Sequence, residues 1–261
     1  MIFCSLYSGS SGNSIFVSSG SSRILIDAGL PGKRIEEALK NIGEDPKNLD
    51  GIFVTHEHSD HSKGLGVLSR RYDIPIYANE LTWESLHGII GTVKDTNIKI
   101  IDNYGTSVKD LDISCFSLPH DAVNPVGYSI NHYNKKVCIA TDLGFFSPEV
   151  KNNIKDADVL LLESNHDVEM LKFGPYPYVL KRRILSDKGH LSNESCGKAI
   201  LEIFDDKHKN VILGHLSKTN NIPELAYQTV ISILQENKII PGSDISITIA
   251  NRDNPSCYIE F

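Results

Sequence analysis

The sequence lacks any apolar run long enough to cross a bilayer, which takes about 20 residues, so we expect no integral membrane protein. Its first ten residues, M-I-F-C-S-L-Y-S-G-S, lack the basic segment and apolar stretch of an export signal, which favours a cytoplasmic protein. The five cysteines are odd in number and widely scattered, with no C-x-x-C pair. This spacing argues against a disulfide framework and indicates reduced, mostly buried thiols.

The sequence also lacks an excess of positive charge, because its net charge is -7 over 261 residues. Any contact with nucleic acid must therefore come from a local basic patch. No linker, low-complexity stretch or fixed-period repeat interrupts a composition of 40% hydrophobic and 23% charged residues, which is typical of globular proteins. We therefore predict a single domain over residues 1–261. The glycine-rich segment 8–13 lacks the Lys-Ser/Thr ending and the helix of a P-loop, so it predicts a tight turn.

The densest group of metal-binding residue types lies in Thr55–His61, T-H-E-H-S-D-H. A helix would point these residues in different directions, whereas a loop at the C-terminal end of a strand can gather them. We expect His56 and His58 to face one metal ion, and Asp60 and His61 to face a second. The alternative is a solvated polar loop, but a cluster this dense rarely arises by chance in a chain with ten histidines.

Three further polar residues end apolar segments in the same manner: His120 in C-F-S-L-P-H, Asp142 in V-C-I-A-T-D and His215 in V-I-L-G-H. If these ends meet at one edge of the fold, His120 completes the first metal site and His215 the second. Asp142 would then bridge the two. Imidazole and carboxylate ligands suit two divalent ions of zinc, manganese or iron. A single histidine at a strand end is more often structural, but three such residues after a ligand loop favour a dinuclear site.

Asp27 also follows an apolar segment, in R-I-L-I-D-A-G-L. A carboxylate buried there needs a partner, because an unpaired buried charge is expensive. The ligand loop is such a partner, and we therefore interpret Asp27 as a support for a metal ligand rather than as a ligand. The alternative is a plain turn aspartate.

Two cations bridged by a carboxylate usually share a water molecule, and they lower its pKa so that hydroxide is available near neutral pH. The same ions neutralise charge on the attacked group, which suits phosphodiesters best. Asp60 would orient this water or accept its proton, and a histidine would protonate the leaving oxygen. The pattern predicts a two-metal phosphodiesterase. The alternatives are a hydrolase of a small ester, lactone or cyclic phosphodiester, and a non-catalytic binding module.

The predicted elements run in the order β-rich, helical, β-rich, helical, which indicates two sheets packed face to face with helices outside. Ile98–Asp142 is predicted to be all-β, and Ala157–Glu163 to be a buried strand. Asp167–Gly189 is predicted to be irregular. Its part from Lys172 to Lys188 has five basic residues and one acidic residue, the reverse of the overall balance. Helices are predicted over residues 31–42, 62–72, 80–90, 148–155, 194–204 and 222–236.

These motifs resemble those of the metallo-β-lactamase fold superfamily. H-E-H-S-D-H is similar to its H-x-H-x-D-H signature, and Asp27, His120, Asp142 and His215 resemble its other ligand and support motifs in the same order. The resemblance covers essentially the whole chain. It implies an α/β fold, a four-layer αβ/βα sandwich, with the metal site at one edge of the sheets. No cysteine stands at position 142 and no Gly-Gly follows the signature, which argues against lactamase and glyoxalase activity.

Together, G-S-S-G-N, T-H-E-H-S-D-H, L-L-L-E-S-N-H-D and K-G-H-L-S-N resemble the YycJ/WalJ branch of that superfamily, which is related to RNase Z-type nucleases. That resemblance implies a 5′-to-3′ DNA exonuclease, with an RNA-processing nuclease as the alternative. The segment Gly189–Ser192 is similar to an RNase Z element whose histidine is thought to protonate the leaving group. This implies that His190 is the general acid. The alternative is a histidine that caps the following helix.

A nucleic-acid substrate would give the basic stretch Lys181, Arg182 and Arg183 a role in holding backbone phosphates. Tyr176 or Tyr178 would be available to stack on a base. The alternative is a solvated surface loop. The remaining candidates for substrate binding are His166, Asn193 and Ser217. The sequence leaves the oligomeric state open.

Overall fold

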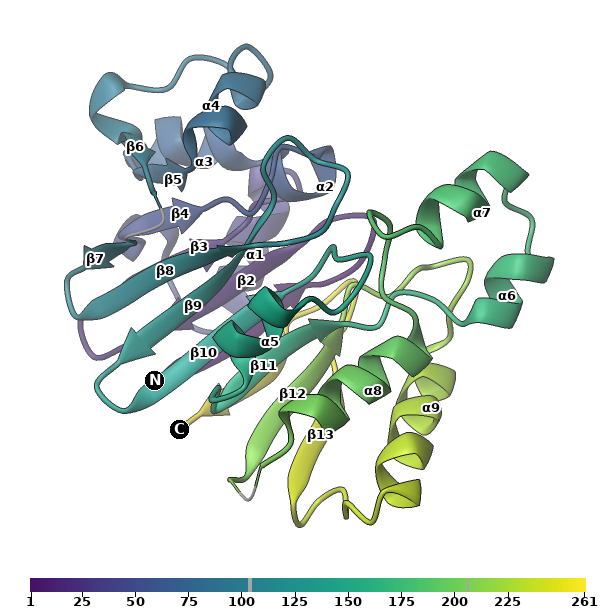
Figure 1. Ribbon diagram of the computed structural model, residues 1–261. Helices are drawn as coiled ribbons and strands as arrows, with labels where there is room; N and C mark the ends of the chain where they lie inside the picture. The colour runs from purple at the N-terminus through teal and green to yellow at the C-terminus, as the bar shows by residue number, and fades with distance from the viewer. Residues whose placement is uncertain (103–104, 206) are drawn as a thin grey trace.

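Two seven-stranded sheets form the centre of the computed structural model, which describes residues 1–102, 105–205 and 207–261 (Figure 1). The first sheet has the order β14-β1-β2-β3-β4-β5-β6 and the second has the order β13-β12-β11-β10-β9-β8-β7. The strands of the first sheet, β1 to β6 and then β14, are Ile2–Tyr7, Ser14–Ser18, Arg23–Ile26, Gly51–Phe53, Ile76–Ala78, Ile98–Ile100 and Ser256–Glu260. Those of the second sheet, β7 to β13, are Thr106–Val108, Leu111–Ser117, Val126–His132, Lys135–Ala140, Val159–Glu163, Lys209–Gly214 and Ile245–Ile249.

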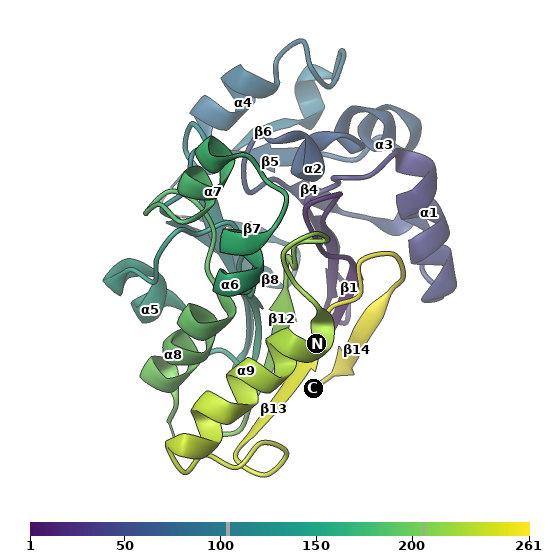
Figure 2. The same cartoon turned by 90° about the vertical axis from the view of Figure 1, so that its right-hand side faces the viewer.

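Helices cover the outer face of each sheet, with α1 and α3 on one side of the strands and α5 and α8 on the other (Figure 2). The helices α1 to α9 are Gly32–Asn41, Ser59–Ser62, Leu65–Tyr72, Glu80–Leu86, Pro148–Ile154, Val168–Phe173, Tyr178–Ile184, Asn193–Ile203 and Pro223–Glu236. Two short 3₁₀ helices are Pro46–Asn48 and Asp95–Asn97. Helices α6 and α7 project beyond the sheets, at the right of Figure 1. In the described part of the chain, no helix is both long and apolar enough to span a membrane.

Strand β11 shows why the apolar residues produce a layered fold. Its side chains alternate between the two faces, as they must in any strand. Leu160 and Leu162 pack in the cluster beneath α5, α8 and α9, whereas Val159 and Leu161 pack in the cluster between the two sheets. A third cluster joins the first sheet to α1, α3 and α4. The four-layer αβ/βα sandwich expected from the sequence is therefore confirmed.

The strands that precede the candidate ligands run in the same direction within each sheet. β3 pairs with β4 in parallel, and β10, β11 and β12 are also parallel neighbours. β9 lies between β8 and β10 and is antiparallel to both, so β8 runs in the same direction as β10. Because the C-terminal ends of parallel strands lie at one edge of a sheet, these strands deliver their following residues to one edge of the sandwich.

Two local predictions are wrong. The segment Asp167–Gly189 is not irregular, because α6 and α7 lie within it. Asp167 caps α6 by accepting the N–H of Met170 at 2.8 Å, and Pro175 and Pro177 separate the two helices. Each helix is too short to show a clear helical period in the sequence. The ligand segment is also not all loop, since Asp60 and His61 lie in α2.

Several predicted boundaries also shift. The predicted helix over 62–72 is split into α2 and α3 by Lys63 and Gly64, and the helix predicted over 80–90 ends at Leu86. The all-β prediction over Ile98–Asp142 agrees with β6 to β10, while residues 103 and 104 within it lie outside the described residues.

Candidate metal centre

Three candidate residues stand where the backbone turns sharply at the end of a strand. Asp27 and His215 directly follow β3 and β12, and Asp142 lies two residues after β10. Their φ angles are 62° for Asp27, 64° for Asp142 and 54° for His215, in the left-handed region that residues other than glycine rarely adopt. Such strained backbone persists only where the surrounding structure enforces it, and it concentrates at functional sites.

Gly29 allows the turn after β3 to approach the ligand segment. A Cβ atom at Gly29 would lie 1.7 Å from the carbonyl oxygen of Asp60, so any side chain there would push the ligand segment away. The same carbonyl oxygen accepts the backbone N–H of Asn13 at 2.8 Å. The D-A-G sequence after β3 thus lets backbone from two distant segments meet behind Asp60.

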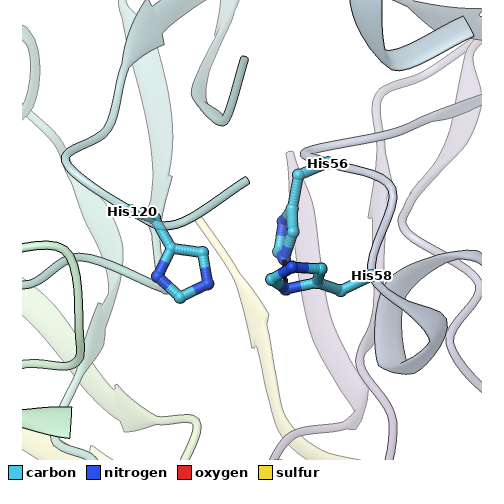
Figure 3. Close-up of side chains that lie close together, drawn as sticks. All are labelled: His56, His58 and His120. Carbon is cyan, nitrogen blue, oxygen red and sulfur yellow. Dashed lines mark hydrogen bonds between the residues drawn. The ribbon is translucent and has the colours of Figure 1, made fainter. Parts of the chain in front are cut away.

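The first set of candidate ligands consists of His56, His58 and His120. Figure 3 shows His56 and His58 on one side and His120 on the other, with the three imidazoles turned toward one another. His56 Nε2 lies 3.1 Å from His58 Nδ1, and one nitrogen of each ring lies within 4.8 Å of the others. His120 Nδ1 is 3.1 Å from the carbonyl oxygen of Gly189, which leaves its Nε2 for a metal ion.

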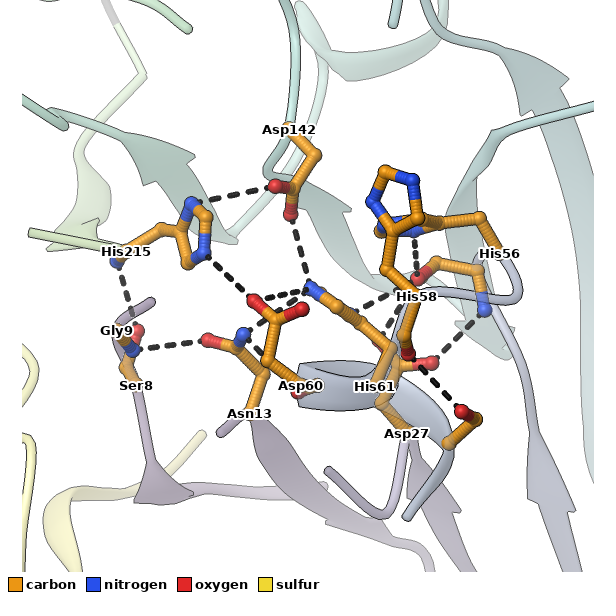
Figure 4. Close-up of polar contacts among 12 residues, drawn as sticks. Ser8, Gly9, Asn13, Asp27, His56, His58, Asp60, His61, Asp142 and His215 are labelled. Atoms are coloured by element: carbon orange, nitrogen blue, oxygen red, sulfur yellow. Dashed lines mark hydrogen bonds and ion pairs between the residues drawn. The ribbon is translucent and has the colours of Figure 1, made fainter. Parts of the chain in front are cut away.

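The second set consists of Asp60, His61 and His215, shown around Asp142 in Figure 4. Asp60 Oδ2 lies 3.6 Å from His61 Nε2 and 3.6 Å from His215 Nε2. Asp142 lies between the two sets, with Oδ2 3.2 Å from His61 Nε2 and Oδ1 3.8 Å from His120 Nε2. The structure therefore brings together all seven residues that the sequence suggested as ligands.

The site fits bound cations. Within the described residues, Asp142 Oδ2 and His215 Nε2 are buried and form no hydrogen bond, although they face His61 Nε2 at 3.2 Å and Asp60 Oδ2 at 3.6 Å. Burying such an atom without a hydrogen bond costs about 1–3 kcal/mol, and a coordinated cation would give both atoms a direct partner. Imidazole nitrogens and carboxylate oxygens are donors that zinc and manganese accept readily.

The Nδ1 atoms of His61 and His56, which face away from the other candidate ligands, lie within hydrogen-bonding distance of protein oxygen atoms. His61 Nδ1 donates to Asp27 Oδ2 at 2.7 Å, and Asp27 also accepts the Thr55 N–H and hydroxyl, each at 2.8 Å. Thr55 Oγ1 lies 3.0 Å from His56 Nδ1. Such contacts orient each ring so that the opposite nitrogen points at the metal. Asp27 thus contacts a candidate ligand, His61, through the nitrogen that faces away from the other ligands.

Glu163, the last residue of β11, is not among the site residues predicted from the sequence, although it is fully buried within the site. Its Oε1 accepts from His215 Nδ1 at 2.7 Å and from His190 Nδ1 at 2.9 Å. Its Oε2 accepts the backbone N–H groups of Leu143 and Leu191, each at 3.0 Å. Glu163 ends an apolar segment as Asp142 and His215 do, so the same strand-end pattern could have identified it.

We expect Glu163→Gln to destabilise the protein by about 3 kcal/mol, the scale of hydrogen bonds lost from a buried charged group. An amide has one accepting oxygen, so it cannot accept from both histidines and from both backbone N–H groups. Equilibrium unfolding in denaturant measures the loss. Glu169→Gln is the matched control, because Glu169 is an exposed partner of Lys172 and should change stability little. Equal stability of the two variants would contradict this account of Glu163.

The two sets of histidines differ in charge. Burial and the neighbouring His61 lower the pKa of His56 well below its ordinary value, and burial lowers the pKa of His120. Both rings are therefore neutral at pH 7, with a lone pair available to a cation. Burial also opposes charge on His61 and His215, but the surrounding carboxylates outweigh it. They raise the pKa of His61 well above its ordinary value and that of His215 to about 10.

Metal binding is therefore expected to release protons from His61 and His215. A raised pKa stabilises the metal-free protein fully below the unfolded value near 6.5, and this stabilisation is lost as the pH rises toward about 10 for His215. A metal ion must displace these protons, so its affinity should increase over the same range. Calorimetric titration with Zn²⁺ or Mn²⁺ at pH 7.5, in two buffers of different ionisation enthalpy, should show about two protons released. Uptake of protons, or no release, would contradict the charge assignment.

His190 lies between the two sets of ligands, with its ring centroid 5.1 Å from that of His120 and 5.4 Å from that of His215. Its side chain is 17% exposed, and Glu163 holds its Nδ1, so its Nε2 is left for a substrate. Burial opposes charge on this ring, but Glu163 outweighs it and raises the pKa of His190. A protonated imidazole at the mouth of the site can donate a proton.

The residues suggested for substrate binding lie outside the ligand sets. His166 is buried with neither ring nitrogen hydrogen-bonded among the described residues, and burial lowers its pKa to about 4. Asn193 is fully buried and accepts the Ser164 hydroxyl at 2.7 Å. Ser217, also buried, accepts the backbone N–H of Asn220 at 3.1 Å.

The three basic residues of α7 differ in their contacts. Lys181 Nζ donates to the carbonyl oxygens of Lys172 and Gly174, each at 2.7 Å, and so braces the turn between α6 and α7. The Arg182 guanidinium lies 6.0 Å from the centre of the exposed Tyr178 ring. Arg183 hydrogen-bonds the carboxylate of Asp121 with two nitrogens. Arg182 and Arg183 are both exposed, but Arg182 faces an aromatic ring whereas Arg183 is paired with a carboxylate.

Comparison with known proteins identifies the class that this fold and site define. The chain matches the Metallo-beta-lactamase superfamily over residues 7–215, and it therefore belongs to that superfamily of hydrolases. It is 44% identical over 247 residues to Exodeoxyribonuclease YycJ of Bacillus anthracis, which covers 94% of this chain and 93% of that protein. It is 42% identical over 259 residues to Exodeoxyribonuclease WalJ of Streptococcus pneumoniae, with 98% and 96% covered. The YycJ/WalJ resemblance is confirmed.

The fold is also shared with a solved structure of more distant sequence. The metallo-beta-lactamase fold protein YhfI of Bacillus subtilis superposes with a TM-score of 0.72 at 16% identity, covering 98% of both chains. At this identity the similarity concerns the fold alone.

Proposed function

We propose that this protein is a DNA exonuclease that degrades DNA in the 5′-to-3′ direction and depends on two divalent metal ions. The observation that carries the proposal is the identity of 44% and 42% with proteins named exodeoxyribonucleases, each over nearly the whole chain. The convergence of the candidate ligands around Asp142 supports it, because two-metal sites suit the hydrolysis of phosphodiesters. We also propose that the enzyme acts in the cytoplasm.

His56, His58 and His120 would hold one cation, Asp60, His61 and His215 the other, and Asp142 would contribute to both. Bound there, zinc, manganese or iron would activate a water molecule as the nucleophile and neutralise charge on the phosphate. Asp60, whose carboxylate faces both His61 and His215, would orient the attacking water and accept its proton. Asp27 and Glu163 keep His61 and His215 in the correct orientation.

His190 acts at the other end of the broken bond. When the P–O bond breaks, the leaving 3′ oxygen of the released nucleotide takes up negative charge and requires a proton. His190 Nε2 donates this proton, while its Nδ1–H remains bonded to Glu163 at 2.9 Å. The nearby Asp142 and Glu163 carboxylates stabilise the protonated imidazole before transfer.

The experiment is digestion of duplex DNA labelled at one 5′ end, at one 3′ end or internally, with Mn²⁺ or Zn²⁺ added. The proposal predicts immediate release of the 5′ label as a mononucleotide and later release of the internal label. Early release from the 3′ end would overturn the polarity. Degradation of a matched RNA but not of DNA would overturn the substrate. Turnover of a small chromogenic phosphodiester alone would indicate a hydrolase of small molecules.

A further inference from the structure

Asp121 places a negative charge beside the first set of ligands. It directly follows His120, and its Oδ1 lies 3.4 Å from His120 Nε2, the nitrogen that faces the metal site. Its side chain is 30% exposed, so the charge is also open to solvent. With Asp60 and Asp142 close by, a free Asp121 carboxylate would repel an incoming phosphodiester.

Arg183 neutralises this charge from helix α7. Its Nη2 donates to Asp121 Oδ1 at 2.9 Å, and its Nε donates to Oδ2. Burial works to raise the pKa of Asp121, but the hydrogen bond from Arg183 outweighs it and lowers that pKa. Among the described residues, no other Lys or Arg forms an ion pair with a carboxylate adjacent in sequence to a candidate metal ligand.

The Arg183–Asp121 pair connects helix α7 to the segment that follows β8 and carries His120. The backbone N–H of Asp121 donates to the carbonyl oxygen of Lys188 at 3.1 Å, beside the turn that carries Gly189 and His190. Helix α7 and the turn after it are therefore tied to the loop that carries His120 and Asp121. Tyr178, Val179 and Arg182 are also exposed on α7, and together with Arg183 they line one surface pocket.

Arg183 can exchange its Asp121 carboxylate partner for a phosphate. A guanidinium offers the same pair of parallel N–H donors to a carboxylate as to a phosphate. The Arg183 side chain is 49% exposed, and exposed ion pairs contribute little to stability, so breaking this one costs little. The hydrogen bond to Asp121 raises the pKa of Arg183, and the charges of Asp60 and Asp142 add to this.

We infer that Arg183 binds a phosphate of the substrate strand and that Asp121 holds Arg183 in place until the substrate displaces it. Asp121 is then a positioning residue that competes with the phosphate. This inference rests on the proposed function and adds the residues that admit the strand. It predicts that removing the two partners changes substrate binding in opposite directions.

The experiment compares Arg183→Gln with Asp121→Asn, using KM and kcat for labelled duplex DNA over a series of salt concentrations. Arg183→Gln should raise KM by about tenfold or more and reduce the salt slope by about one phosphate contact. Asp121→Asn should lower KM several-fold, because Arg183 is released and a repelling charge is removed. Most of this gain should disappear when Asp121→Asn is combined with Arg183→Gln. Metal content should stay unchanged in all three variants.

A second ion pair serves as the matched control. Arg71 and Glu36 form an exposed Arg–carboxylate pair between α3 and α1, on the outer face of the first sheet. Arg71→Gln and Glu36→Gln should leave KM and the salt slope unchanged. If both Asp121→Asn and Arg183→Gln raise KM, the pair is structural and the inference fails. It also fails if Asp121→Asn loses metal, or keeps its full gain without Arg183. Absence of DNA degradation by the unaltered protein would instead reject the proposed function, and this inference with it.

Discussion

Replacing Asp142 by alanine is expected to lower kcat by about 10³-fold or more and to reduce the metal content of the protein. Loss of one preorganised electrostatic group in an active site typically costs about 10²–10³-fold, and Asp142 faces both sets of ligands. Without its carboxylate, the charged His61 and His215 would lose a neighbouring counter-charge, and each metal ion would keep only the three ligands of its own set. Steady-state hydrolysis of labelled DNA, together with metal analysis of the same preparation, measures both effects.

Asp156→Ala is the matched control for this experiment. Asp156 is an exposed aspartate paired with Lys136, and it lies in the turn that leads into β11, at the end of the strand opposite Glu163. Its removal should leave kcat and metal content unchanged. Retention of full metal content and near-normal kcat by Asp142→Ala would show that this carboxylate does not join the two sites.

Replacing His190 by alanine is expected to lower kcat for DNA by about 10²–10⁴-fold, the usual contribution of a general acid, while metal content stays unchanged. The leaving 3′ oxygen of DNA is strongly basic and requires a proton as the bond breaks. A p-nitrophenyl phosphodiester has a leaving group that is stable as an anion. Its hydrolysis should therefore be affected far less. The ratio of the two losses measures proton donation separately from any general damage to the site.

His87→Ala is a suitable control, because His87 is exposed at the C-terminal end of α4. It should leave hydrolysis of both substrates unchanged. An equal loss of activity on DNA and on the p-nitrophenyl substrate by His190→Ala would contradict the role of His190 as an acid. Loss of metal in that variant would place the residue among the ligands or their supports.

Much of the site could be predicted from the sequence because its residues follow one physical pattern. The site contains four polar residues at or just beyond the ends of apolar strands: Asp27, His120, Asp142 and His215. Burying a polar or charged group there is costly unless it has a partner, so such residues indicate a site. The fold brings these ends to one edge, so the pattern and the geometry agree. Glu163 shows the same pattern, but the four apolar residues before it make β11 look like an ordinary core strand.

Other features depend on contacts that no local pattern specifies. The left-handed backbone at Asp142 and His215 follows from tertiary packing, because neither residue type requires it. Helices α6 and α7 are too short to show a period, and prolines lie between them. The basic stretch of α7 was identified from composition. Its three cations nevertheless differ in their contacts. Lys181 binds backbone carbonyl oxygens, Arg183 binds the Asp121 carboxylate, and Arg182 binds neither kind of group in the described part of the chain. These contacts depend on the tertiary structure.

The measurement that tests the central claim most directly is the number of divalent ions bound per chain. Bound metal would be removed with a chelator, and the protein would be reloaded with Mn²⁺ or Zn²⁺ and freed of excess ions. Its metal content would then be measured by inductively coupled plasma mass spectrometry. We expect about two ions per chain in the unaltered protein and fewer in Asp142→Ala. Nuclease activity should disappear on stripping and return on reloading. Full activity in stripped protein, or no ion bound after reloading, would contradict the account.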